Sequence, residues 1–255
     1  MIDTHCHLDF QDFDHDRDAV ISRCEAVGVS KIMVPAVSAA SFERSIKVCE
    51  QYPNLELALG LHPFFIEAHQ PQDLIQLDSQ IHQHCPRAVG EIGLDFFEPA
   101  LRSEILKEKQ IAFFSKQLII AKQHKLPVII HNRKAHDHCI RLLEEIRVPG
   151  GIIHAFNGNI QQAKKYIDLG FLLGFGGMLT FERSVKLRKL ASQLPLTSMV
   201  LETDAPDMTV FQHKGERNSP EYLPFIQQAL ASIKGCTLEA VAETTSLNAK
   251  RIFSL

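Results

Sequence analysis

Three His-X-His pairs are the first feature of the sequence that suggests metal binding: His5/His7, His82/His84 and His136/His138. Side chains two residues apart share a face on a strand but diverge on a helix. The first pair ends an apolar run with the pattern of a strand, and Asp3 is on the same face, so three potential ligands point together. The other two pairs lie in helical or pre-helical segments, where we expect solvated surface histidines.

An acid or an imidazole takes the same position, at the end of an apolar run, in several other segments: His62, Glu91, His131, His154 and Asp204. One histidine after such a run is usually a hydrogen-bonded structural residue, but several at one rim are hard to explain by packing. Burying so many titratable groups together is costly unless a metal ion or hydrogen bonds compensate. The cluster therefore predicts bound divalent cations.

The ligand types indicate which ions and which chemistry to expect. Imidazoles and carboxylates without cysteine favour zinc, manganese, iron or nickel over an all-oxygen calcium site. One carboxylate can bridge two ions, so we expect two divalent ions per chain, with magnesium also among the candidates. A pair of ions about 3.5 to 4 Å apart, bridged by one carboxylate, activates water and stabilises the attacking and leaving oxygens of a displacement. Hydrolysis is therefore favoured. Redox cofactors and covalent catalysis are less supported, because no glycine-rich phosphate loop, GxSxG elbow or Cys/His nucleophile pair stands out.

Eight short apolar or β-branched runs alternate with longer amphipathic segments, which is typical of β-then-α units around a parallel sheet. The runs cover residues 2–5, 31–37, 55–62, 88–94, 127–131, 151–156, 171–175 and 199–204. Eight units in 255 residues predict a single-domain (β/α)8 TIM barrel over residues 1–255. An open doubly wound sheet is the alternative, because periodicity cannot show closure. The segment 206–224 lacks periodicity and follows the last run, so we expect a substrate loop there.

Composition limits the partners of the protein. The formal net charge of -3 excludes a broadly basic surface, so a nucleic acid would have to be held locally. The six cysteines are far apart and include no CxxC pair, so we expect reduced thiols. The sequence has no basic, apolar leader and no apolar run near the ~18 residues that span a bilayer. We therefore expect a cytoplasmic protein with no membrane partner and no obligate protein partner.

Six motifs occur in a fixed order along the chain: DTHCHLDF, GLHP, GEIGLDFF, VIIHNR, HAFNGN and LETDAPDM. With them the sequence resembles the TatD family of metal-dependent deoxyribonucleases, within the amidohydrolase-like superfamily. The resemblance runs nearly from end to end, and several spaced motifs are far more specific than His-X-His alone. It implies a (β/α)8 barrel and a metal-dependent phosphodiesterase, commonly a DNase.

The resemblance also implies roles for the residues of these motifs. Glu91 would bridge two metal ions. The remaining ligands would divide between the two sites, with His5, His7 and Asp204 at the first and His131 and His154 at the second. Asp204 would also orient or deprotonate the attacking water.

Three further residues each have two possible roles. His62 contacts the scissile phosphate or the leaving group, or it packs within its loop. Glu202 shares a strand face with Asp204 and either supports the ligands or is a buried structural acid. Arg133 is either a phosphate clamp, by its fork geometry, or one half of a surface salt bridge.

One position departs from the family pattern. Relatives often have a further histidine after GxHP, whereas this sequence has Phe64 and Phe65. Together with Phe96 and Phe97 these rings could stack on bases, but apolar packing of the loops is favoured because phenylalanine is usually buried. We therefore do not infer substrate contacts for this loop from the family pattern.

The sequence as a whole predicts a metal-dependent phosphodiesterase that acts on DNA at strand ends. An activated hydroxide does not itself select phosphorus over carbon, so a metal-dependent amidase or lactonase is the second hypothesis. A non-catalytic metal-binding protein is the third, and the intact ligand set argues against it.

Overall fold

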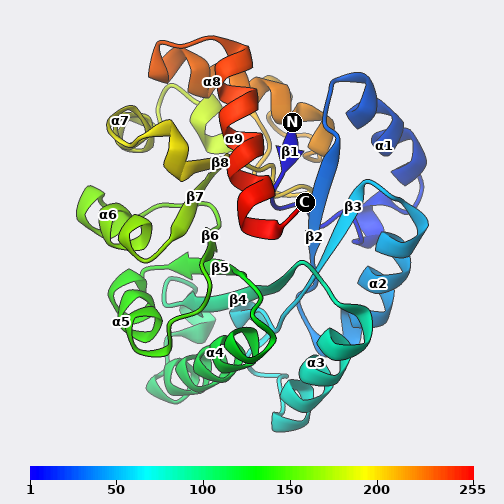
Figure 1. Cartoon of the computed structure of the whole chain (residues 1–255), viewed down its shortest axis with the longest axis vertical. Coiled ribbons are helices and arrows are strands. Elements are labelled where there is room, and N and C mark those ends of the chain that lie inside the picture. The colour runs from blue at the N-terminus through cyan, green and yellow to red at the C-terminus, as the bar shows by residue number, and fades with distance from the viewer.

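The computed structural model describes residues 1–255 and shows a barrel of eight parallel strands inside a ring of helices (Figure 1). The strands neighbour one another in chain order: β1 (Ile2–Asp3), β2 (Lys31–Pro35), β3 (Leu55–Leu59), β4 (Ala88–Asp95), β5 (Val128–Arg133), β6 (Gly151–Ile153), β7 (Phe171–Phe175) and β8 (Met199–Leu201). The Thr4 N–H donates to the Leu201 carbonyl at 3.0 Å, which joins the last strand to the first. The predicted (β/α)8 barrel is confirmed, since a doubly wound sheet has a different strand order.

A helix follows each strand, and a further helix ends the chain: α1 (Arg17–Ala26), α2 (Phe42–Gln51), α3 (Pro71–His84), α4 (Glu104–His124), α5 (His136–Ile146), α6 (Ile160–Asp168), α7 (Val185–Gln193), α8 (Leu223–Lys234) and α9 (Leu238–Phe253). None of them combines the length and the apolar character that crossing a bilayer requires. Short 3₁₀ turns occupy several of the connections, among them Pro63–Phe65 after β3.

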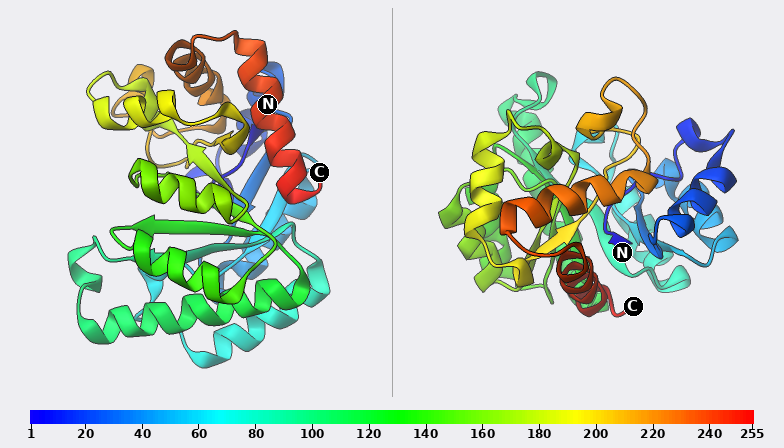
Figure 2. Two further views of the ribbon diagram at one scale, coloured as in Figure 1. Left: turned by 60° about the vertical axis from the view of Figure 1, so that its left-hand side comes forward. Right: turned by 90° about the horizontal axis from the view of Figure 1, so that it is seen from above.

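One end of the barrel is closed by apolar side chains. A cluster of buried residues takes members from every strand and from α9: Ile2, Met33, Ala58, Ala88, Ile129, Ile152, Leu172, Val200, Ala249 and Phe253. Helix α9 lies in front of the strands in Figure 1, and both chain termini are on this side (Figure 2). The loops that follow the strands therefore form the opposite mouth, where a barrel of this type binds its ligands.

Several strands end earlier than the apolar runs predict. The predicted runs that continue past their strands are 2–5, 31–37, 55–62, 151–156 and 199–204. The overhanging residues include four that were predicted to carry chemistry: His5, His62, His154 and Asp204. They lie in the loops at the mouth, because the hydrogen bonding between strands stops before them. These apolar runs are longer than the strands, because the residues just after each of these strands are still buried. Only Glu91 and His131 of the predicted ligands lie within strands.

The expectation of a solvated His136 is wrong. Helix α5 begins at His136, whose side chain packs inward with 7% of the residue exposed. Its Nδ1 lies 3.2 Å from the Tyr166 hydroxyl, and its Nε2 lies 3.2 Å from Oδ1 of Asn157. His82 and His138 are exposed, as expected for residues on helices. The first turn of α5 faces the loop after β6, and this contact buries one histidine of the pair.

We expect Phe253→Ala to lower the free energy of unfolding by about 3 to 5 kcal/mol, because it opens a cavity in the cluster that closes the barrel. Phe253 is 1% exposed. The matched control is Phe211→Ala, at a residue that is 59% exposed, which should change the stability by no more than about 0.5 kcal/mol. Urea unfolding followed by circular dichroism measures both. Equal losses for the two variants would contradict a role for α9 in closing the barrel.

Candidate metal centre

Glu91 lies at the centre of a group of buried histidines. Its Oε2 is 3.1 Å from Nε2 of His5 and 3.6 Å from Nε2 of His7. Its Oε1 is 3.2 Å from Nε2 of His62 and 3.2 Å from Nδ1 of His131. The two carboxylate oxygens therefore face two different pairs of imidazoles, and the side chain is only 3% exposed.

The first group of donor atoms has the spacing of a metal site. Asp204 joins His5, His7 and Glu91, with its Oδ1 3.6 Å from Nε2 of His5 and 3.8 Å from Nε2 of His7. The two imidazole Nε2 atoms are 3.3 Å apart. Four ligands placed tetrahedrally about 2.1 Å from a zinc ion lie about 3.4 Å from one another. The donor atoms of His5, His7 and Asp204 lie close enough together to share an ion, and their separations of 3.3 to 3.8 Å fit a zinc-type cation.

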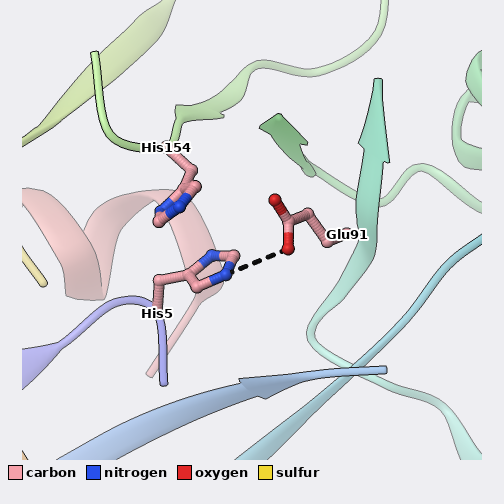
Figure 3. Close-up of side chains that lie close together, drawn as sticks. All are labelled: His5, Glu91 and His154. Atoms are coloured by element: carbon pink, nitrogen blue, oxygen red, sulfur yellow. Dashed lines mark ion pairs between the residues drawn. The ribbon is translucent and has the colours of Figure 1, made fainter. Parts of the chain in front are cut away.

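His154 approaches the same centre from the loop after β6. Its ring stacks on that of His5, with the ring centroids 3.6 Å apart, and Glu91 lies beside the pair (Figure 3). The three side chains form a second group whose donor atoms lie close enough to share an ion. The Nε2 of His154 is also 3.5 Å from Oδ2 of Asp204. Asp204 therefore faces His154 with one oxygen and the His5/His7 pair with the other.

The surroundings keep the two central carboxylates ionised. Burial by itself would raise the pKa of Glu91, but the neighbouring His62 and His5 hold it well below its usual range. Burial likewise opposes ionisation of Asp204, yet His154 lowers the pKa of this acid to about 2. Burial lowers the pKa of His5, which leaves that imidazole neutral. Although burial opposes it, the carboxylates beside His7, His131 and His154 raise the pKa of these three imidazoles, so a bound cation would have to displace their protons.

Glu202 contacts His154 from the side away from the centre. Its Oε1 accepts the Ala155 N–H at 2.6 Å and lies 3.1 Å from Nδ1 of His154. A Cβ at Gly174 would lie 2.2 Å from Oε2 of Glu202, so only glycine leaves room for this carboxylate. Both predicted descriptions of Glu202, the supporting acid and the buried hydrogen-bonded acid, match this geometry. Such a contact sets the ring orientation of a ligand histidine.

Asp95 orients His131 in a similar way, and it is not among the residues that the sequence predicts. Its Oδ2 lies 3.0 Å from Nε2 of His131, and its Oδ1 accepts the N–H groups of Phe97 and Glu98 at 2.8 and 2.9 Å. Asp95 is paired with Arg133 in the register of β4 and β5. It is one residue beyond the predicted run, and only the register between the two strands reveals that it reaches His131.

The prediction that Asp3 points into the cluster is wrong. Its carboxylate accepts hydrogen bonds from the Thr203 hydroxyl at 2.5 Å, the Thr203 N–H at 3.0 Å and the His5 N–H at 3.2 Å. Strand β1 ends at Asp3, so the alternation that would align Asp3 with His5 does not continue. Asp3 instead fixes the backbone next to His5 and Asp204. Burial raises its pKa to about 7.

His62 presents an N–H group to the centre. Its Nδ1 accepts the Phe64 N–H at 3.1 Å, and a neutral imidazole that accepts at Nδ1 carries its proton on Nε2. Burial lowers the pKa of His62 to about 4, so the ring is neutral. His62 lies near enough to Glu91 and His131 to form a third group of possible ligands. The tautomer, however, suits a hydrogen-bond donor better than a ligand.

The cluster opens onto a cavity of about 1350 Å³ at the mouth of the barrel. Phe64 and Phe65 line it and are 51% and 41% exposed, so the expectation that loop packing buries these rings is wrong. The ring centroids are 5.7 Å apart in an edge-on arrangement. Of the predicted substrate loop 206–224, only Asp207 and Met208 line the cavity.

Arg133 also lines the cavity and takes part in two contacts. Its guanidinium lies 4.3 Å from the ring centroid of Phe97, and its Nη1 is 3.3 Å from Oδ2 of Asp95. The side chain is 40% exposed, so part of the guanidinium fork stays accessible. The predicted salt bridge is present, and the geometry also leaves room for a phosphate contact.

We expect Glu202→Gln to weaken Zn²⁺ binding by about 10- to 100-fold, because the amide cannot pair with His154 as a carboxylate does. The fold should persist, since glutamine has the same shape. Competition with a chromophoric chelator measures the affinity, and circular dichroism checks the fold. Glu182→Gln, at an exposed glutamate, is the control that should bind Zn²⁺ normally. Unchanged affinity in the Glu202 variant would contradict the supporting role.

Comparison with known proteins gives full-length matches. The family model for TatD related DNase matches residues 2–254. The metal-dependent hydrolase YjjV of Escherichia coli is 38% identical over 100% of this chain and 98% of its own. The crystal structure of YjjV has a TM-score of 0.94 at 37% identity, covering 100% of this chain and 98% of that one. The human deoxyribonuclease TATDN3 is 33% identical over 99% of this chain and 94% of its own.

These similarities extend over the whole barrel and are not confined to the segments around the metal centre. YjjV and TATDN3 both exceed 30% identity, and the family model spans nearly every residue. The chain therefore belongs to the family of TatD-related DNases.

Proposed function

We propose that this protein is a divalent-metal-dependent phosphodiesterase that hydrolyses DNA at strand ends. The observation that carries the proposal is that Oε2 of Glu91 faces His5 and His7 while Oε1 faces His131, which suits a carboxylate that bridges two ions. The human relative named as a deoxyribonuclease supports DNA as the substrate. The apolar and cationic lining of the cavity supports a substrate that has both flat and anionic parts.

Six side chains would hold the two ions. Glu91 would be shared, and the others would divide as His5, His7 and Asp204 for one ion and His131 and His154 for the other. Bound divalent ions of this type lower the pKa of water and neutralise charge on a phosphate group. The nitrogen and oxygen donors suit zinc, manganese, iron or nickel, and the oxygen donors extend the choice to magnesium.

Asp204 would orient the attacking water. Its two oxygens face different histidines, so the carboxylate is held on both sides at the edge of the cavity. Its pKa of about 2 makes it a poor proton acceptor, while an ionised carboxylate still accepts a hydrogen bond from water. Orientation of the water is therefore better supported than its deprotonation by Asp204.

His62 and Arg133 would contact the phosphate. The Nε2–H of His62 is aimed at Oε1 of Glu91 and could instead donate to a phosphate or leaving-group oxygen that enters the cavity. Arg133 is always charged, and Asp95 and Phe97 hold its guanidinium in place. Its remaining N–H groups would bind a non-bridging oxygen.

The proposal is tested by metal analysis of protein purified without added ions, together with a hydrolysis screen. We expect two divalent ions per chain and turnover of oligodeoxynucleotides and of bis(p-nitrophenyl) phosphate. EDTA should abolish both activities, and divalent ions should restore them. Faster turnover of lactones or cyclic amides would change the substrate class. Tight metal binding without any hydrolysis would instead favour a metal-binding protein.

We expect Glu91→Gln to be more damaging than His131→Ala. A bridging carboxylate contributes to both sites, whereas a terminal histidine contributes to one. The Glu91 variant should therefore lose bound metal from both sites and most of its activity, while the His131 variant loses metal from one site. Metal stoichiometry and kcat/KM are measured on the same samples. A Glu91→Gln protein that keeps two ions and near-normal turnover would refute the bridge.

A further inference from the structure

Three cationic side chains on or just before α7 line the cavity. They are not part of the motifs that contain the candidate ligands. Arg183, Lys186 and Lys189, which we call the α7 wall, lie on the same cavity as Glu91 and Asp204. None of the three forms an ion pair or donates a side-chain hydrogen bond within the chain, and Arg183 only stacks over Phe181 at 5.0 Å. Their charges are therefore available to a ligand in the cavity.

This concentration of positive charge is local. Residues 183–201 contain four cationic and no acidic residues, in a chain whose net charge is -3. By contrast, Arg23, Lys31 and Arg217 each pair with a carboxylate. Unpaired cations along one wall of a cavity raise the local potential and attract anions. The wall would therefore hold an anionic partner locally, which the overall charge of the protein does not favour.

The wall faces an aromatic surface across the mouth. Strands β3 and β7 are four apart in a ring of eight, so the loops that follow them are on opposite sides of the barrel. Figure 1 shows α3 and α7 on opposite sides in the same way. Phe64 and Phe65 follow β3 and line the same cavity as the wall. Exposed rings give bases a surface for stacking, and cations contact the backbone that joins them.

We propose that the α7 wall binds backbone phosphates of single-stranded DNA at positions other than the scissile phosphate. This inference rests on the proposed function and deepens it, because it makes the substrate an oligonucleotide and not a mononucleotide ester. The cavity of about 1350 Å³ exceeds the ~300 to 1,000 Å³ of ordinary small-molecule pockets. It therefore has room for more than one nucleotide. A single strand, whose bases are free to stack, matches the combination of rings and cations.

The test compares a wall variant with a matched control in metal-loaded protein. The wall variant is Arg183→Gln/Lys186→Gln/Lys189→Gln, and the control is Lys164→Gln/Lys165→Gln/Arg251→Gln, at exposed residues that do not line the cavity. The probes are fluorescent, hydrolysis-resistant phosphorothioate oligothymidylates, a dinucleotide and a decanucleotide. Fluorescence anisotropy gives the affinities over a range of salt concentrations, and bis(p-nitrophenyl) phosphate gives the turnover.

We expect the wall variant to bind the decanucleotide roughly tenfold or more weakly. The slope of log K against log [salt] should be shallower by about 2, since three phosphate contacts are lost. Binding of the dinucleotide and turnover of the small ester should stay as in the wild type. The control variant should resemble the wild type in all of these measurements.

Three results would overturn the inference. They are unchanged affinity and salt dependence in the wall variant, equal weakening in the control, and loss of small-ester turnover in the wall variant, which would mean that α7 supports the metal centre. Binding is measured without cleavage, so the outcome is separate from that of the proposed function. A wild-type protein that hydrolyses no diester yet binds the decanucleotide through the wall would sink only the proposed function.

Discussion

The structure depends on the mutual compensation of buried carboxylates and imidazoles around Glu91. Removing either kind of group from water is costly unless a partner or an ion compensates. Glu91 and Asp204 have strongly lowered pKa values because histidines surround them. Each charge depends on its neighbours, so the cluster acts as one unit. The rigid barrel strands and the loops that follow them keep that unit together.

A second set of carboxylates supports the cluster from outside. Asp95 holds His131, Glu202 holds His154, and Asp3 holds the backbone between His5 and the loop after β8. Asp95 and Asp3 act on groups of neighbouring strands, which parallel pairing places side by side. Glu202 instead reaches His154 past β7, where Gly174 leaves room for its carboxylate. The barrel therefore provides both the position and the orientation of the candidate ligands.

The sequence predicts the barrel and the clustering of the candidate ligands because burial and residue type coincide at the ends of apolar runs. His5, Glu91 and Asp204 are polar groups where packing alone would favour apolar side chains, and this contrast is visible without a structure. The contact of Asp95 with His131 depends on the register between two strands, which one strand's pattern does not contain. The predictions for Asp3 and His136 are wrong for a related reason. Strand β1 ends early at Asp3, and helix α5 packs His136 against the loop after β6. Both are tertiary effects.

The electrostatics of the cavity differ between its two parts. Glu91 and Asp204 are ionised and would repel a phosphate group, so an anion can approach this part only when bound cations outweigh the carboxylates. The cations of the α7 wall have no ion-pair partner and would attract a phosphate with or without those ions. An anionic chain would then be held at the α7 wall by side chains alone and at the metal centre by bound cations. In a chain of net charge -3, this arrangement would confine nucleic-acid binding to the mouth of the barrel, where cleavage would occur.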